Sequence, residues 1–234
     1  MVKEIIFNGQ AGKIEGKYHQ NPDPQAPIAL ILHPHPLHGG TMNNKVVYNM
    51  FYTFVKNNFS VLRFNFRGVG KSTGIFDNGV GELMDAAAAM DWLQTQNPEA
   101  SSYWISGFSF GAWIALQLLM RRPEVNGFIA VSPPANSYDF NFLSPCPAQG
   151  LIIQGTKDTV VSEEAVYNLY EKLEKQRDSN VEYVPVNNAD HFFAGELDKL
   201  NEAIENYIKP RIAVMQRPRK VKRDRRRRQL PDAG

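Results

Sequence analysis

The sequence predicts an α/β fold: a mostly parallel, doubly wound sheet of about eight strands flanked by helices, with no cap domain. Short apolar runs alternate with amphipathic helical segments from residue 28 onward, which is typical of right-handed β-α-β units. The runs at 28–32 and 128–131 are continuously apolar, as expected of strands covered on both faces. Only residues 132–149 separate the run at 128–131 from the next strand, too few for a separate cap domain.

The strands are predicted from alternation at the N-terminus and from apolar runs elsewhere. Alternating side chains at 2–7 and 13–19 indicate a hairpin at a sheet edge, and Asn21-Pro22-Asp23-Pro24 indicates the turn that follows it. The later strands have the length and composition of buried strands. We expect these at 28–33, 61–66, 102–106, 128–131, 151–153 and 181–186.

The helices are predicted from apolar residues that recur at helical spacing. In the segment 44–57, for example, Met50 and Phe54 share one face. Ser162 is a suitable N-cap, because its hydroxyl can accept a backbone N–H of the following turn. The last helix should end at Pro210, since proline lacks the N–H that a helix interior needs. We expect helices at 44–57, 81–95, 112–120, 163–174 and 197–208.

The composition is that of a globular protein, with 43% apolar and 21% charged residues. No apolar run is long enough to cross a bilayer, and the first residues lack the apolar stretch of a secretory leader. Cys146 is the only cysteine, so no disulfide can form within the chain. We therefore expect a cytoplasmic protein without a membrane span, and the sequence leaves its oligomeric state open.

Charge is distributed unevenly along the chain. Residues 209–234 carry eleven Lys and Arg against two acids, a charge of +9, which leaves −7 on residues 1–208. Prolines interrupt this segment, and few apolar residues follow Met215. We therefore expect one folded domain at 1–208 and a disordered basic tail at 209–234, which could contact polyanions without specificity.

The strongest functional signal is Gly107-Phe108-Ser109-Phe110-Gly111, between a predicted strand and a predicted helix. In this context G-x-S-x-G forms a nucleophile elbow, a sharp turn that holds the serine hydroxyl out over the sheet. The two glycines are needed because a side chain at either position would collide with the neighbouring strand or helix. Ser109 is therefore the expected nucleophile.

A serine nucleophile needs a base, and the base needs an acid that orients it. On this kind of sheet the chain order is serine, acid, histidine. Of the five histidines only His191 follows Ser109, so it is the expected base. Asp158, just after the strand predicted at 151–153, is the expected acid. Asp190 is a weaker alternative, because a direct neighbour cannot easily turn its carboxylate toward the imidazole.

Acyl transfer also needs backbone N–H donors for the oxyanion. We expect one from Phe110 and the other from the loop at 33–40, whose two prolines have no N–H to offer. His35 and Leu37 remain in that loop, and His35 is preferred because it lies closer to the end of the strand. The same loop contains a histidine cluster, but without a carboxylate nearby we expect no metal there.

Aromatic residues in the segment after 128–131 and beside His191 are candidates for substrate contacts. The absence of a cap domain predicts an open site, and aromatic walls favour small or aromatic-bearing esters over long lipids. We expect these walls to include Tyr138, Phe140, Phe142, Phe192 and Phe193.

Taken together, the motifs resemble those of small bacterial α/β-hydrolases without a lid, a serine hydrolase subfamily related to the dienelactone hydrolases. The resemblance covers residues 3–208. It is carried by His33-Pro34-His35-Pro36 with Gly39-Gly40-Thr41-Met42, Arg63-Phe64-Asn65-Phe66-Arg67-Gly68-Val69-Gly70, Gly107-Phe108-Ser109-Phe110-Gly111, Gly155-Thr156-Lys157-Asp158 and Asp190-His191-Phe192-Phe193. The resemblance implies Ser109, Asp158 and His191 as the catalytic triad. Dienelactone hydrolases proper use a cysteine nucleophile, so their lactone specificity is not carried over.

The expected function is therefore hydrolysis of a small ester or related acyl substrate through an acyl-enzyme intermediate, with no cofactor. Two alternatives stay open. An open site also suits peptide ends, so the chain could be a serine peptidase of the same fold. A non-catalytic module that binds polyanions through the tail at 209–234 is the alternative from a different class.

Overall fold

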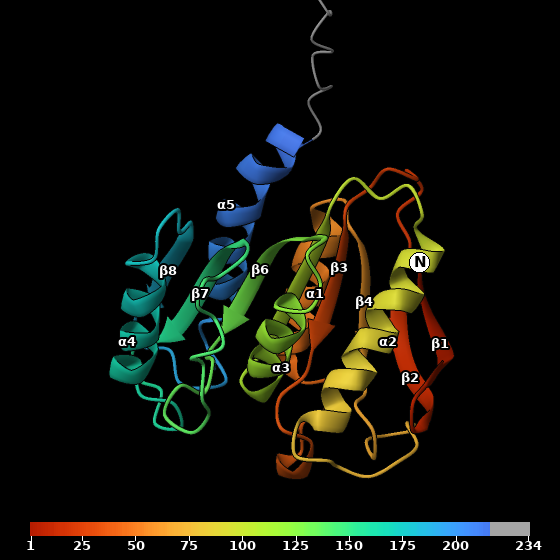
Figure 1. The fold of residues 1–234 in the computed structure, drawn as a ribbon, viewed down its shortest axis with the longest axis horizontal. Helices are drawn as coiled ribbons and strands as arrows, with labels where there is room; N and C mark the ends of the chain where they lie inside the picture. Colours follow the sequence, from red (N-terminus) through yellow and green to blue (C-terminus); the bar gives the residue numbers. More distant parts are fainter. Residues whose placement is uncertain (216–234) are drawn as a thin grey trace, which may run out of the picture.

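The computed structural model describes residues 1–215 and contains one eight-stranded sheet in the order β1-β2-β4-β3-β5-β6-β7-β8 (Figure 1). At one edge of the sheet, β1 pairs with β2 and β2 pairs with β4, both in antiparallel orientation. All other pairs are parallel. The mostly parallel sheet predicted from the sequence is confirmed. The strands are β1 (Val2–Gly9), β2 (Gly12–His19), β3 (Ile28–Leu32), β4 (Ser60–Phe64), β5 (Tyr103–Phe108), β6 (Val125–Val131), β7 (Gln149–Gly155) and β8 (Val181–Val186).

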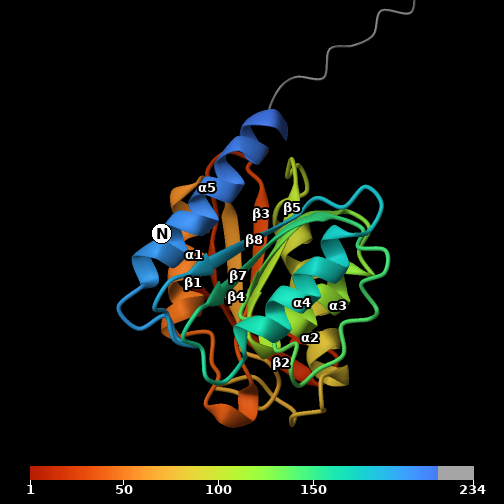
Figure 2. The ribbon, with the colours of Figure 1, turned by 90° about the vertical axis from the view of Figure 1, so that its left-hand side faces the viewer.

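Helices cover both faces of the sheet, which Figure 2 shows edge-on. One face carries α1 (Lys45–Lys56) and α5 (Leu197–Met215), and the other carries α2 (Val80–Gln96), α3 (Phe110–Leu119) and α4 (Glu163–Glu174). A short 3-10 helix, η1 (Pro36–His38), follows β3. All five residues of β3 are buried, as predicted for a central strand, and they alternate between the two apolar cores.

The helix starts follow the capping rules. The Ser162 hydroxyl accepts the N–H of Ala165 at 3.3 Å, which confirms the predicted N-cap of α4. The Asn44 side chain caps α1 in the same way, accepting the N–H of Val46 at 2.9 Å. These caps fix where each helix enters from the loops at the carboxyl ends of the strands.

The prediction that the last helix ends at Pro210 is wrong, because α5 continues to Met215. Pro210 and Asn206, whose carbonyl loses its helical partner, are both exposed, so water can replace the missing hydrogen bond. Beyond the proline, Arg211 stacks on the Tyr207 ring at 3.6 Å and Ile212 packs into the core. These contacts stabilise the additional turn, and residues 209–215 therefore belong to the folded domain.

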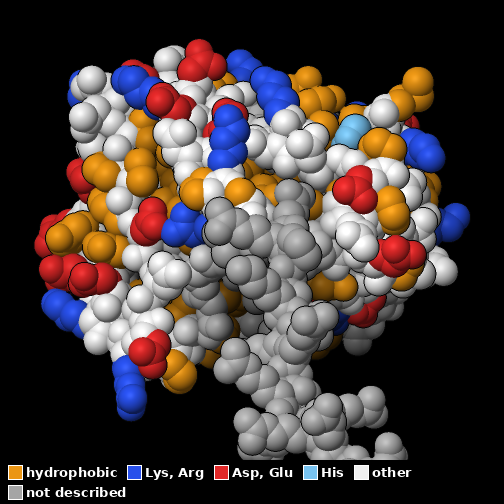
Figure 3. Space-filling model, turned by 90° about the horizontal axis from the view of Figure 1, so that it is seen from above, with side chains coloured by type: hydrophobic (Ala, Val, Ile, Leu, Met, Phe, Trp, Pro, Cys, Tyr) orange, Lys and Arg blue, Asp and Glu red, His pale blue; other side chains and the backbone are white. Residues whose placement is uncertain are grey.

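The rest of the predicted basic tail, residues 216–234, lies outside the described residues. Its contact with polyanions therefore stays a prediction. Within 1–215 no helix is both long and apolar enough to cross a membrane. Figure 3 views the edge opposite the carboxyl ends of the parallel strands, where acidic and basic side chains are interspersed among apolar ones. Neither sign of charge dominates that visible face.

A buried ion pair ties the loop after β4 to α2. The Arg67 guanidinium donates to both carboxylate oxygens of Asp85, at 2.8 and 3.0 Å, and the Arg67 backbone N–H donates to the same carboxylate at 2.9 Å. Both side chains are at most 9% exposed. Gly81 leaves room for this pair, because a Cβ at that position would collide with the guanidinium.

Replacing Asp85 with alanine should lower the free energy of unfolding by about 3–5 kcal/mol, because Arg67 would remain buried without its main counterion. Asp77, at 3.9 Å, is too distant and too exposed to take over. Urea denaturation checks this result. The control is Asp91→Ala, which removes an exposed partner of Arg122 and should cost less than about 1 kcal/mol. Equal losses in the two variants would contradict the prediction.

Candidate active site

Ser109 lies at the turn between β5 and α3, in the conformation that a nucleophile elbow requires. Its φ of 54° and ψ of −122° are unfavourable for a residue with a side chain, and its N–H donates to Val131 O at 2.8 Å. A Cβ on Gly107 would collide with the backbone of Gly111. A Cβ on Gly111 would lie 2.5 Å from the carbonyl oxygens of Leu32 and His33. The glycines therefore permit the turn, and the half-buried serine side chain lies at the carboxyl edge of the sheet.

The segments that follow β5, β7 and β8 bring three side chains together at this edge. His191, in the loop after β8, places Nε2 3.2 Å from the Ser109 hydroxyl oxygen. Its Nδ1 lies 2.7 Å from Oδ2 of Asp158, which follows β7. The imidazole and the carboxylate are almost fully buried, whereas Ser109 is partly open to solvent. The three groups form a continuous hydrogen-bonded row across 82 positions of chain.

The Asp158 carboxylate is held by donors on both oxygens. Oδ1 accepts the backbone N–H groups of Val160 and Val161, each at 2.8 Å, and Oδ2 accepts from His191 and from the Gln154 amide. Burial alone would raise the pKa of Asp158, but the hydrogen bonds from His191, Val161 and Val160 outweigh it and hold the pKa below its ordinary value. An ionised Asp158 can only accept, so His191 carries its proton on Nδ1 and presents a lone pair on Nε2 to Ser109.

The alternative acid, Asp190, is occupied elsewhere. Its Oδ1 accepts the N–H groups of Phe192 and Ala194 at 3.0 and 2.9 Å, and the residue is exposed. These bonds shape the turn that carries His191, so Asp190 supports the loop, while the carboxylate that reaches the imidazole belongs to Asp158.

The two residues expected to donate to the oxyanion, Phe110 and His35, have neighbouring side chains. Phe110 is the first residue of α3, so its N–H has no acceptor within the helix. Across residues 1–215 the N–H of His35 donates to no protein acceptor either, whereas the N–H of Leu37 donates to His35 Nδ1 at 3.2 Å. The rings of His35 and Phe110 are 4.9 Å apart. The geometry thus leaves the N–H of His35 free and that of Leu37 engaged.

His33 holds this loop in place and does not resemble a metal ligand. Its Nε2 accepts the N–H of Phe66 at 3.0 Å, so Nδ1 carries the proton and donates to Pro34 O at 2.6 Å. Complete burial lowers the pKa of His33 to about 4, so the ring is neutral near pH 7. No group of three or more potential metal ligands occurs in the part of the chain that the structure describes.

Of the residues predicted to contact the substrate, some lie beside Phe110 and His191 and others do not. The half-exposed Phe192 packs beside His191, with ring centroids 5.2 Å apart, and Tyr138 packs on Trp113 at 4.4 Å and on Phe110 at 6.0 Å. Phe140 and Phe142 stack on each other and, within the described chain, neither ring contacts Phe110 or His191.

Phe193 does not line the site. It is fully buried in the core beneath α5, so the expectation that its side chain faces the substrate is wrong. Its φ of 54° explains the difference, because the turn after His191 sends the two neighbouring aromatic side chains in different directions.

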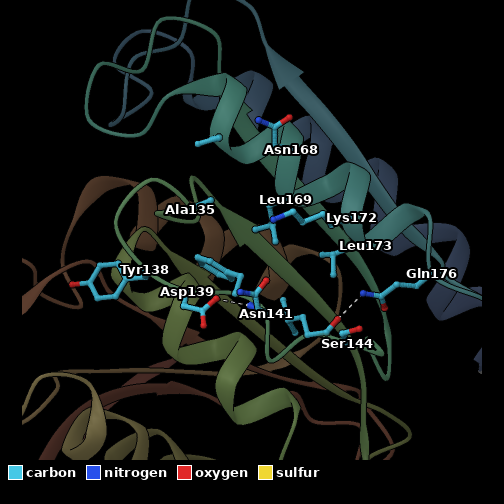
Figure 4. Close-up of a pocket in the computed structure, with 13 residues that line it drawn as sticks. Ala135, Tyr138, Asp139, Asn141, Ser144, Asn168, Leu169, Lys172, Leu173 and Gln176 are labelled. Atoms are coloured by element: carbon cyan, nitrogen blue, oxygen red, sulfur yellow. Dashed lines mark hydrogen bonds between the residues drawn. The ribbon is translucent and has the colours of Figure 1, made fainter.

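One cavity of the described structure lies apart from Ser109, Asp158 and His191. It has a volume of about 540 Å³ and lies between α4 and the segment after β6 (Figure 4). Its apolar lining residues include Leu169 and Leu173 of α4 and Phe140 and Leu143 of that segment. None of Ser109, Asp158 and His191 lines it. The Tyr138 ring is at its margin and points away from the other lining side chains in Figure 4.

The site also contains residues that the sequence analysis missed. Gln154 bonds Asp158 from the strand, and Trp113 fixes one wall through an N–H bond to Asp139 O at 3.1 Å. Gln154 left a detectable signal, because it is the one polar residue in the apolar run Leu151-Ile152-Ile153-Gln154. Trp113 gave none, since an aromatic residue in an apolar helix is most often simply part of a core.

The chain is similar in sequence and in fold to several known proteins. Residues 37–151 match the model of the alpha/beta hydrolase fold family. An uncharacterized protein of Rickettsia prowazekii is 55% identical over 209 residues, 88% of each chain. A solved protein of unknown function from Agrobacterium tumefaciens is 51% identical, with a TM-score of 0.88 over 91% of this chain and 97% of that one. A serine hydrolase without a lid from Xanthomonas campestris is 32% identical, with a TM-score of 0.81 over 89% and 94% of the two chains.

Proposed function

Because the chain belongs to the α/β-hydrolase family, we propose that it is a serine hydrolase that cleaves a small ester or related acyl substrate through an acyl-enzyme intermediate. The observation that carries the proposal is the hydrogen-bonded row from Asp158 through His191 to Ser109. Each member has the partner that its role needs: an acceptor beside the hydroxyl, and a carboxylate behind the imidazole.

In the first half of the reaction, His191 Nε2 takes the proton of the Ser109 hydroxyl as its oxygen attacks the substrate carbonyl carbon. The carbonyl oxygen becomes an oxyanion and accepts hydrogen bonds from the N–H groups of Phe110 and His35. The bond to the leaving alkoxide then breaks, and the alkoxide takes the proton from His191. Asp158 stays ionised throughout and stabilises the imidazolium.

The second half repeats these steps with water. His191 takes a proton from water as the water oxygen attacks the acyl carbon bound to Ser109, and the oxyanion forms in the same place. Collapse breaks the bond to the Ser109 oxygen, which recovers its proton from His191. The products are a carboxylic acid and the free enzyme.

The surroundings of Ser109 favour a small or aromatic-bearing substrate. The segment between β6 and β7 is too short for a cap, so within residues 1–215 no lid encloses a long acyl chain. Tyr138 and Trp113 beside Phe110, and Phe192 beside His191, provide flat apolar surfaces on two sides of the serine.

Turnover of p-nitrophenyl acetate, compared with an acyl p-nitroanilide of the same acyl group, tests the proposal. We expect burst release of p-nitrophenol and a kcat/KM for the ester at least about 100-fold above that for the anilide, since a nitrophenolate is a much better leaving group than an anilide nitrogen. Equal values for the two would indicate a peptidase. No turnover of either, by folded protein, would contradict the proposed function.

A further inference from the structure

Gln154 is a fully buried amide at the carboxyl end of β7, four residues before Asp158. Its Nε2 lies 3.2 Å from Asp158 Oδ2 and 2.9 Å from Val161 O. Burying an amide within an apolar strand is costly unless it is hydrogen-bonded. A residue at this position that only filled space would be apolar, like its neighbours in β7.

The neighbours determine which way the amide faces. Nε2 is within hydrogen-bond distance of three oxygens, those of Asp158, Val161 and Gly155, and none of the three can donate when Asp158 is ionised. An amide oxygen in the same place would face three acceptors, so this side must be the NH2 group. Across residues 1–215, the other side of the amide, Oε1, has no partner. Gln154 is therefore a donor to the carboxylate.

Two donors thus converge on Asp158 Oδ2, one from Gln154 and one from His191 at 2.7 Å. The other oxygen is held by backbone N–H groups of the loop that carries Asp158 itself. Gln154 differs from these partners because it belongs to a strand in the sheet, which holds a side chain more rigidly than a loop does.

We propose that Gln154 is a positioning residue that fixes the orientation of the Asp158 carboxylate toward His191. It touches no reacting atom and acts only through Asp158, so this inference rests on the proposed function. Without Gln154 the carboxylate loses one of two donors on Oδ2 and gains freedom to turn. His191 would then no longer be held in one tautomer, and its Nε2 would be less often free to accept the Ser109 proton.

The test replaces Gln154 with methionine, which has similar length and volume but no donor. The expected result is a kcat for p-nitrophenyl acetate that is about tenfold lower, with KM changed by less than about twofold. The matched control is Gln117→Met in α3, where the Nε2 has no partner within the described residues and which does not contact the triad. That variant should keep kcat within about twofold.

The second readout separates positioning from a packing defect. The ¹⁵N chemical shifts of the His191 ring report which nitrogen carries the proton, and His191→Ala assigns the signals. We expect wild type and Gln117→Met to hold the proton on Nδ1, and Gln154→Met to populate both tautomers. Gln154→Asn, a smaller amide too short to reach Asp158, should behave in the same way if the methionine variant does not fold.

An unchanged tautomer population in both Gln154 variants would overturn the assignment, because a lower kcat alone would then reflect altered packing. The tautomer measurement does not depend on turnover. A wild-type protein that hydrolyses no ester would count against the proposed function, while the role of Gln154 toward Asp158 would still be decided by the ¹⁵N shifts.

Discussion

Replacing Ser109 with alanine should reduce kcat for p-nitrophenyl acetate by about 10⁴-fold or more, with the fold retained. The reason is that alanine removes the oxygen that His191 Nε2 contacts at 3.2 Å, and no other side chain in the site occupies that position at the elbow. Initial rates at saturating ester, with circular dichroism to verify folding, check this result.

Ser106→Ala is the matched control. Ser106 lies on β5, three residues before Ser109, and its buried hydroxyl donates to Ile129 O at 2.9 Å rather than to Asp158 or His191. We expect this variant to lose some stability and to keep kcat within about threefold. Turnover by Ser109→Ala within tenfold of wild type would remove Ser109 from the mechanism.

Replacing Asp158 with asparagine should reduce kcat by about 10⁴-fold, although the shape of the side chain is unchanged. The N–H groups of Val160 and Val161 at 2.8 Å require an acceptor, so the amide oxygen must face them. The new NH2 group then points at His191 Nδ1, which has to become an acceptor. The imidazole proton moves to Nε2, where it faces Ser109 and prevents it from giving up its proton.

Asp190→Asn controls for loss of a carboxylate in the same region. The carbonyl oxygen of asparagine can still accept the N–H groups of Phe192 and Ala194, so the turn before α5 should persist. We expect kcat within about threefold of wild type. Steady-state kinetics of the two variants test this assignment. A larger loss of kcat in Asp190→Asn than in Asp158→Asn would show that Asp158 is not the acid.

The sheet and the elbow could be predicted because their causes are local. A continuous apolar run implies a strand covered on both faces. The glycines around Ser109 are required because backbone segments approach closely there, and a single sequence is enough to identify this G-x-S-x-G pattern. The proposed base followed from chain order, since only one histidine comes after Ser109. These inferences did not require knowledge of which side chains meet.

The features that the sequence did not reveal depend on tertiary packing. Pro210 interrupts one hydrogen bond of α5, but the contacts of Arg211 and Ile212 with the rest of the domain outweigh it. Phe193 packs into the core beneath α5 through a backbone turn with a φ of 54°, and neither the turn nor the packing can be read from composition. The proposed role of the Gln154 amide depends on its hydrogen bond to Asp158, which the fold of the following loop brings within reach.

The most direct measurement is reaction of the folded protein with a fluorophosphonate, followed by peptide mapping of the modified residue. The reagent resembles an acyl substrate and phosphonylates a serine only where a base activates it. The account predicts one modified residue, Ser109, and a rate of labelling that falls at least about 100-fold in His191→Ala. Labelling at a different residue, or labelling of Ser109 at an equal rate without the imidazole, would contradict the claim that Asp158, His191 and Ser109 act as one unit.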